Sequence, residues 1–271
     1  MAASDKLFAG GIPEVYDRLL VPLLFESYAE DLARRAARLE PRDVLESAAG
    51  TGALTQALTK ALPAAARIVA TDLNQPMLDR AAAQLPNGGR VVSRQADALN
   101  LPFDAGTFDL VLCQFGVMFF PDKLRGYAEA RRVLKSGGSF LFNVWDKISE
   151  NEFADVVTRA LADLLGPGAP DFMVRTPHGH HDAAKIEQEL KAGGFASVAV
   201  ETLDRSSRAP SAGDVAIAYC QGTPIRNELE AAFPGRLEEA TRFAAEALAK
   251  RFGSGMVEGR IRAHVFTAIR E

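Results

Sequence analysis

Residues 44–52, with the sequence VLESAAGTG, restrict the fold of this chain more than any other stretch. An apolar run ends at an acid, Glu46, passes into a turn that holds Gly50 and Gly52, and is followed by a helical pattern. This order is typical of a parallel strand, a tight turn and a covering helix. Because glycine has no Cβ, the backbone amides of such a turn can approach a bound ligand closely.

Asp72 stands twenty residues after Gly52, at the end of the next apolar run, RIVATD. A carboxylate at that place can accept hydrogen bonds from two ribose hydroxyls, so the pattern predicts a cofactor that contains adenosine. A dinucleotide site would have a third glycine, whereas residues 53–55 read ALT. Glu46 would also repel a pyrophosphate, but it suits the ammonium group of a zwitterionic methionine. The pattern therefore favours S-adenosylmethionine over a dinucleotide.

Strand and helix patterns alternate through the first half of the chain. The expected strands are residues 42–48, 67–72, 91–97, 107–115 and 139–146, and the expected helices are 12–40, 53–62, 75–85 and 123–134. Pro22 is expected to separate two helices, the turn at 87–89 to end the third helical pattern, and Gly137 with Gly138 to stop the fourth. Strands that are apolar throughout indicate a parallel sheet covered by helices on both faces.

The pattern changes after Asp146. We expect a helix at 152–166, a loop rich in proline and glycine, a capped helix at 182–195 and a strand at 196–204. Helices broken at Pro224 and at 233–236 fill residues 211–252, and a last strand covers 259–270.

The predicted fold is an α/β, doubly wound, Rossmann-like sheet, mostly parallel, with an antiparallel C-terminal edge pair. We expect one domain over residues 1–271, with a cofactor-binding core at 42–146 and lid or substrate insertions at 148–181 and 205–255. Ligands of such sheets bind outside the carboxyl ends of the strands. The strand ends at 46–52, Asp72, Asp97 and Gln114 are therefore predicted to form one crevice, although Asp97 could instead cap a turn.

Four segments of residues 42–146 resemble class I S-adenosylmethionine-dependent methyltransferases, of the small-molecule kind near the ubiquinone and menaquinone biosynthesis methyltransferases. VLESAAGTG resembles the first motif of that family and ATDLNQPML its ribose-binding acid. RQADALNLPFDAGTFDLVLCQF is similar to the adenine-binding segment with the fourth strand, and RRVLKSGGSFLF to the entry of the fifth strand. The resemblance implies transfer of a methyl group from S-adenosylmethionine to a small, apolar or aromatic molecule by in-line displacement.

The resemblance also implies a set of cofactor-binding residues. Asp72 would hold the ribose, Leu73 and Met77 would pack on the adenine, and Asp97 with the amide of Ala98 would bind its polar edge. The full set is Tyr16, Glu46, Ala49, Gly50, Thr51, Gly52, Asp72, Leu73, Met77, Asp97, Ala98, Gln114 and Phe115. Two features depart from the family: residues 47–49 read SAA within the first motif, and residues 118–120 read MFF where many relatives carry a histidine pair.

The sequence leaves the catalytic residue open. The candidates are His178, His181 and Tyr16. The histidines lie in the motif PHGHH, which a turn leading to Asp182 as a helix N-cap also explains. We expect no metal, because no acid or cysteine completes a metal-binding spacing. A general base is required only if the nucleophile carries a proton of high pKa.

Charge and cysteine content exclude other classes. The net charge is −4 and the arginine pairs have acidic neighbours, so no nucleic acid is expected as a partner. The chain has only two cysteines, too few for a disulfide framework. The start MAASDKLFAG has no apolar core of signal-peptide length, and no apolar run is long enough to span a membrane. We therefore expect the protein in the cytoplasm. A non-catalytic protein that binds S-adenosylmethionine or S-adenosylhomocysteine is the alternative, and a nicotinamide-dependent dehydrogenase is disfavoured. Substrate identity, acceptor atom and oligomeric state stay open.

Overall fold

The computed structural model describes residues 11–84 and 89–271, which divide between two compact units. The sheet unit consists of residues 26–144, 181–203 and 264–271. The helical unit consists of residues 11–25, 145–180 and 204–263. We keep these two names below and describe each unit by itself.

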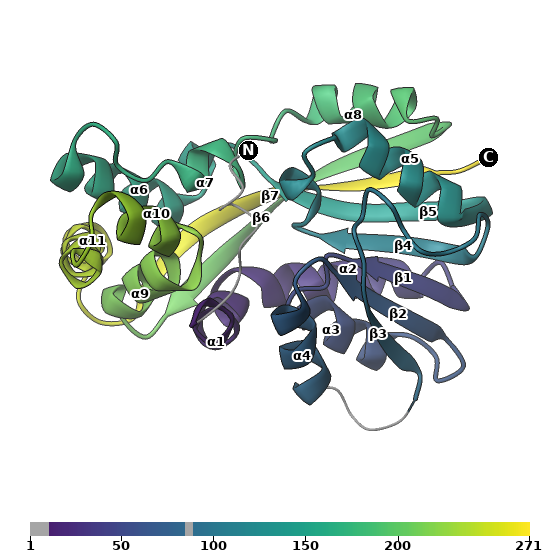
Figure 1. Cartoon of the computed structure of the whole chain (residues 1–271), viewed down its shortest axis with the longest axis horizontal. Coiled ribbons are helices and arrows are strands. Elements are labelled where there is room, and N and C mark those ends of the chain that lie inside the picture. The colour runs from purple at the N-terminus through teal and green to yellow at the C-terminus, as the bar shows by residue number, and fades with distance from the viewer. Residues whose placement is uncertain (1–10, 85–88) are drawn as a thin grey trace. The chain divides into compact units, whose positions relative to one another are not determined.

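Seven strands form one sheet in the order β3-β2-β1-β4-β5-β7-β6 (Figure 1). Their bounds are β1 (Asp43–Ser47), β2 (Arg67–Asp72), β3 (Val91–Gln95), β4 (Phe108–Gln114), β5 (Leu134–Trp145), β6 (Ser197–Ala209) and β7 (Val257–Ile269). The five strands from β3 to β5 pair in parallel. In contrast, Gly137 N–H donates to the Arg270 carbonyl (2.7 Å) and Asp146 N–H to the Arg262 carbonyl (3.0 Å), so β7 runs antiparallel to β5. The predicted fold class is confirmed.

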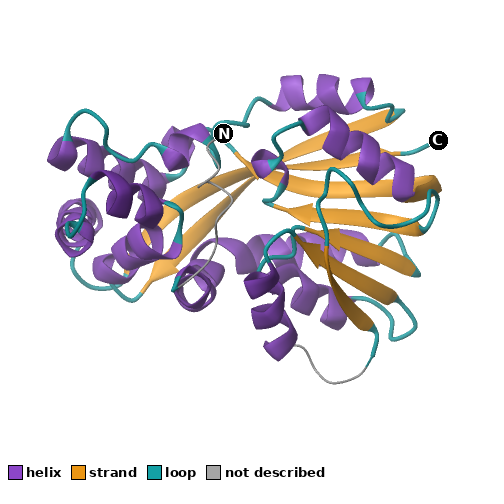
Figure 2. Cartoon of the chain, viewed as in Figure 1, coloured by secondary structure: helices purple, strands orange, loops and turns teal. Residues whose placement is uncertain are grey.

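Helices follow the strands along the chain (Figure 2). In the sheet unit they are α2 (Glu26–Ala37), α3 (Ala53–Ala61), α4 (Gln75–Gln84), η3 (Val117–Phe119), α5 (Lys123–Val133) and α8 (Ala183–Ala192). Asp182 caps α8, because its side chain accepts the N–H of Lys185, as the sequence predicts.

Side chains that alternate along β5 divide the core of the sheet unit between two faces. Leu141 belongs to an aliphatic cluster with Leu32 of α2 and Leu58 of α3. Its neighbours Phe140 and Phe142 point to the other face. There they stack with each other at 4.7 Å between ring centroids, in a group completed by Tyr127, Phe195 and Phe266. Both faces are therefore buried, which is why these strands read as nearly continuous apolar runs.

Two predicted boundaries are wrong. Pro22 does not separate two helices: it lies in a π-helical stretch, η2 (Tyr16–Phe25), between α1 (Ile12–Val15) and α2, so the helical run continues. The wider π-helical turn accommodates a residue that has no backbone N–H. Likewise α5 ends at Val133, before the two glycines, and β5 begins at the next residue. The predicted turn at 87–89 begins outside the described residues.

Gly137 and Gly138 lie within β5, where the pairing with β4 shifts register between Phe108 and Leu110. Gly137 has a φ of 77°, which other residues rarely adopt. One class of β-bulge places a glycine in this left-handed region, so these glycines belong to a strand irregularity and not to a helix end.

The helical unit contains α6 (Glu152–Leu165), α7 (Phe172–Arg175), α9 (Ala212–Gly222), α10 (Ile225–Ala232) and α11 (Leu237–Phe252), together with the short η4 (Ile148–Glu150). The breaks at Pro224 and at 233–236 are confirmed, because α10 lies between them. The segments expected as insertions, 148–181 and 205–255, fall almost entirely in this unit, and their function as a lid stays a prediction. Over residues 11–84 and 89–271, no helix combines the length and apolar character that crossing a membrane requires.

Candidate cofactor site

The turn between β1 and α3 has an unusual backbone. Ala48, Gly50 and Gly52 have φ values of 54°, 57° and 88°. A Cβ on Gly52 would lie 3.0 Å from the Cβ of Ala81 in α4, so a side chain would disturb the packing of that helix. The turn is fixed by backbone hydrogen bonds, one of them from Ala49 N–H to the Thr71 carbonyl (2.8 Å). These contacts explain the two glycines that the sequence singles out.

Asp72, the last residue of β2, joins this turn to the next one. Its Oδ2 accepts the N–H of Gly50 at 2.9 Å, and its Oδ1 accepts the N–H of Asn74 at 2.8 Å. Burial raises the pKa of Asp72, while these hydrogen bonds oppose the shift. Oδ1 also accepts a hydrogen bond from Nδ2 of Asn74 at 3.4 Å. Oδ2 has a second lone pair, so the side chain can still accept from a ligand hydroxyl.

Glu46 is a second buried acid in the same place, with only 1% of its surface exposed. The hydroxyl of Thr55 donates to its Oε2 at 2.6 Å. Burial raises the pKa of Glu46 to about 8, and the nearby charge of Asp72 adds to the shift. Within the described part of the chain, neither acid forms an ion pair. A ligand that carries a positive charge would therefore stabilise the ionised pair.

Two further buried polar atoms have no hydrogen-bond partner among the described residues: the hydroxyl of Thr51, in the glycine turn, and Nδ2 of Asn143, in β5. Leaving such a group unsatisfied costs about 1–3 kcal/mol. A polar ligand bound at the turn would offset part of this cost at Thr51.

The end of β4 is held by three neighbouring elements. Phe115 has a φ of 49°, its N–H donates to Oδ1 of Asn143 at 2.9 Å, and its ring meets Tyr28 of α2 edge-on at 5.3 Å. A Cβ on Gly116 would lie 2.5 Å from the Cβ of Ala48, so the chain after β4 passes very close to the glycine turn. Sequence reasoning missed Tyr28, Gly116 and Asn143. An asparagine inside the apolar run FLFNVW is the one signal that could have revealed the last of these.

We call this assembly the strand-tip site: Glu46, residues 48–52, Asp72, Phe115 and Asn143. The register of the strands brings it together, since β1 pairs with both β2 and β4, and Gln114 of β4 pairs with Asn143 of β5. Parallel strands end at the same edge of a sheet, so the predicted convergence of strand ends follows from the strand order.

The residues predicted around the adenine lie at the neighbouring strand end. Leu73 is 44% exposed, whereas Met77 is buried, with its Cε 3.7 Å from the position of a Cβ on Gly50. Asp97 is exposed, and its Oδ1 accepts the N–H of Leu99 at 2.9 Å. Asp97 therefore caps a turn in the unliganded chain, and its contact with adenine stays a prediction, as does that of the adjoining Ala98.

Comparison with known proteins supports one family. The family model described as a methyltransferase domain matches residues 45–142. The ubiquinone/menaquinone biosynthesis C-methyltransferase of Saccharophagus degradans is 39% identical over 56% of this chain and 66% of its own length. The demethylmenaquinone methyltransferase of Deinococcus radiodurans is 28% identical over 71% of this chain and 85% of its own length.

One similar solved structure is phosphoethanolamine N-methyltransferase 2 of Haemonchus contortus, in complex with S-adenosylhomocysteine. It matches with a TM-score of 0.62 at 14% sequence identity, and the match covers 100% of this chain and 61% of that one. At this identity the likeness shows a shared fold. These matches support a class I S-adenosylmethionine-dependent methyltransferase that resembles the ubiquinone/menaquinone biosynthesis methyltransferases. The cofactor of the methyltransferase is S-adenosylmethionine, and the alternative of a non-catalytic binder has no support from these relatives.

The strand-tip site of the methyltransferase fits this cofactor chemically. S-adenosylmethionine brings an ammonium group, ribose hydroxyls and a sulfonium. Among the described residues, the site offers two buried acids that pair with no cation, a hydroxyl of Thr51 that has no partner, and a turn from which Cβ atoms are absent at Gly50 and Gly52. A negatively charged pyrophosphate would instead oppose the ionisation of both acids.

The catalytic candidates are distributed over both units. Tyr16 and His178 belong to the helical unit and His181 to the sheet unit. Tyr16 stacks on Phe25 at 5.2 Å. His178 is buried, with Nδ1 2.7 Å from the Asp146 carbonyl oxygen, and His181 is partly buried at the start of α8.

Their roles in the reaction of the methyltransferase stay predictions. Across the described ranges, no three His, Cys, Asp or Glu side chains are grouped so as to hold a metal ion.

Proposed function

We propose that the methyltransferase transfers a methyl group to a small aromatic acceptor of the quinone type by in-line displacement. The buried acids Glu46 and Asp72 beside the glycine turn carry the cofactor part of this proposal, because no cation of the described residues pairs with them and a cationic ligand would favour their ionised forms. The acceptor class is supported by two relatives, which are named for ubiquinone, menaquinone and demethylmenaquinone.

In this proposal, residues of the strand-tip site and other predicted cofactor-binding residues contact different parts of the cofactor. Glu46 pairs with the ammonium group, Asp72 holds the ribose, and the turn at 48–52 lies against the methionine portion. Leu73 and Met77 pack on the adenine, Asp97 and Ala98 bind its polar edge, and Gln114 with Phe115 faces the sulfonium and the acceptor. Tyr16 closes over the cofactor from the N-terminal helix.

When bound, S-adenosylmethionine supplies a sulfonium whose methyl carbon is already electrophilic. The chain's own task is then to orient the acceptor in line with the carbon–sulfur bond and to exclude water, and such positioning can account for most of the acceleration. A hydroquinone has acidic hydroxyls and an electron-rich ring, so its methylation places little demand on a protein base. If a base is needed, His178 and His181 are the candidates, and the segments 148–181 and 205–255 act as the lid.

The direct test is methyl transfer from labelled S-adenosylmethionine. The acceptor panel contains reduced naphthoquinones without a ring methyl group, their oxidised forms, and amines such as phosphoethanolamine. We expect label only in the reduced quinones, at a rate that the Asp72→Ala variant lowers. Label in the amines alone would replace the acceptor class, and label in none of the compounds would refute the proposed function.

We also propose that the protein works in the reducing cytoplasm. Free, buried cysteines such as Cys113 and Cys220 are compatible with that compartment.

A further inference from the structure

Asn143 is a polar residue in the apolar interior of the sheet unit. It lies in β5, in register with Gln114 of β4, and its side chain is fully buried. A backbone N–H can only donate, so the side-chain atom that faces the N–H of Phe115 at 2.9 Å must be the amide oxygen. The amide nitrogen then points elsewhere and has no partner among the described residues. An apolar residue would avoid this unsatisfied group, but it would also remove the acceptor of the Phe115 N–H.

Phe115 needs such a contact, because its backbone is strained. A φ of 49° is rare for a bulky residue, and a strained conformation of this kind persists only where the surroundings determine it. The surroundings here are Asn143, the ring of Tyr28 and the close approach of Gly116 to Ala48. Among these contacts, the hydrogen bond from the N–H of Phe115 to Asn143 acts directly on the strained backbone.

We propose that Asn143 is a positioning residue for methyl transfer, which holds the backbone of Phe115, and through it Gln114, in the conformation that receives the acceptor. The proposal rests on the proposed function, in which these two residues face the sulfonium and the acceptor. It also explains why the residue is an amide: an aspartate would place a third buried acid at a site that already holds Glu46 and Asp72.

Two variants of Asn143 and one control separate positioning from simple stability. Asn143→Leu keeps the approximate volume and removes the oxygen. Asn143→Asp keeps an oxygen opposite the amide of Phe115. Leu141→Ala is the matched control, because it opens a cavity in the same strand without touching β4 at Phe115. For each protein we would measure the melting temperature, the affinity for S-adenosylhomocysteine, kcat and KM for the quinol, and hydrogen exchange of the residue 115 amide.

In Asn143→Leu we expect kcat to fall about 10- to 100-fold, because small misplacements of reacting groups have effects of this size. The affinity for S-adenosylhomocysteine should change much less, and the amide of Phe115 should exchange faster. Leu141→Ala should lower the melting temperature and keep the native kcat. In Asn143→Asp, kcat should be partly restored at low pH, where the carboxyl is protonated, and should decrease as the pH rises. The leucine variant should lack this dependence.

A folded Asn143→Leu protein with native kcat, or an equal loss of kcat in Leu141→Ala, would overturn the proposal. If the leucine variant does not fold, the aspartate variant decides, because a native kcat at every pH would also overturn it. If the native protein methylates none of the acceptors, the proposed function is refuted and this proposal with it. Native turnover with unaffected variants would refute this proposal alone.

Discussion

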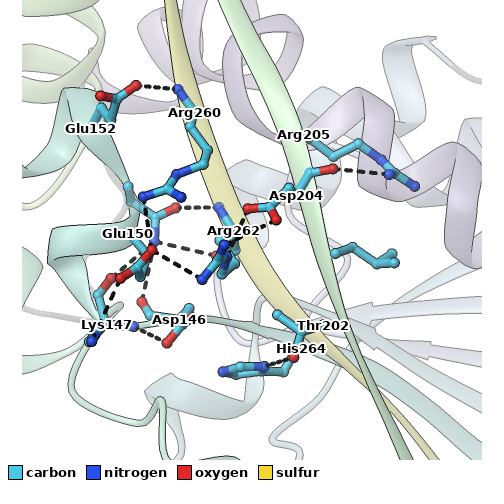
Figure 3. A network of polar contacts seen from close by, with 12 residues as sticks. Asp146, Lys147, Glu150, Glu152, Thr202, Asp204, Arg205, Arg260, Arg262 and His264 are labelled. Atoms are coloured by element: carbon cyan, nitrogen blue, oxygen red, sulfur yellow. Dashed lines mark hydrogen bonds and ion pairs between the residues drawn. The ribbon is translucent and has the colours of Figure 1, made fainter.

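Acidic side chains occur in two contrasting settings in this protein. In the strand-tip site of the sheet unit, Glu46 and Asp72 are buried, have hydrogen bonds only to neutral groups, and have raised pKa values. In the helical unit, Asp204 and Glu150 are bound by Arg262 at 2.7 and 3.1 Å (Figure 3). The hydrogen bond from Arg262 lowers the pKa of Asp204.

The difference between these settings separates function from structure. In an exposed ion pair, the two charges already neutralise each other in the folded chain. Such a pair contributes little to stability. Buried acids without a cation weaken the unliganded fold, so their presence at the strand ends indicates a charge that arrives with the ligand. The following predictions test this contrast, in order of decreasing effect.

The largest effect is expected at the glycine turn. Gly52→Ala forces a side chain into a left-handed φ of 88° and places its Cβ 3.0 Å from that of Ala81. We expect a loss of about 2–3 kcal/mol in the free energy of unfolding. Gly168→Ala is the control, because its φ of 89° is the same and nothing lies within 4 Å of its Cβ. It should lose only about 1 kcal/mol in urea unfolding, and equal losses would show that the contact with Ala81 is unimportant.

Asp72→Ala should weaken S-adenosylhomocysteine binding by about 1–3 kcal/mol, because it removes both the ribose acceptor and the hydrogen bond to Gly50. Calorimetric titration measures the change. Asp79→Ala is the control: Asp79 is exposed on α4 and accepts a hydrogen bond from the neighbouring Gln75, so the variant should bind normally. Unchanged affinity in the Asp72 variant would place the ribose elsewhere.

Glu46 should make cofactor binding depend on pH. Its folded pKa, about 8, lies above the ordinary glutamic acid pKa of 4.5, so the unliganded protein loses stability as the pH rises between these values. A bound ammonium favours the ionised acid, and binding therefore releases a proton. Affinity for S-adenosylhomocysteine should then rise with pH, by up to about tenfold per unit below 8. Glu46→Gln should remove this slope, whereas a slope that persists in the variant would assign it to another group.

The smallest effect is expected in the ion-pair network. Asp204→Ala removes a pair with Arg262, but the aspartate side chain is 53% exposed. Solvent screening limits the loss of unfolding free energy to about 0–1 kcal/mol. Cofactor affinity should stay native. A loss as large as that of Gly52→Ala would mean that the two settings do not differ as we describe.

Sequence reasoning identified much of the fold and part of the site. The strand at 67–72 and the caps and breaks around α8 and α10 depend on short-range patterns, and the structure agrees with them. The boundaries predicted at Pro22 and Gly137 were wrong because they, too, depended on short-range patterns. Proline usually ends a helix and paired glycines often follow one, but a π-helical stretch and a β-bulge place these residues inside elements.

By itself the sequence determined the alternation of strands and helices, the turn at Gly50 and Gly52, and the acid that ends the second strand. Each of these depends on neighbouring residues and on the period of the apolar side chains. Only the tertiary structure decided that Asn143 meets the amide of Phe115, 28 residues away, and that Glu46 is buried, with no cation of the described residues paired to it. Strand order and register bring such groups together, and no local pattern encodes them, because the same short segment could pair with several partners.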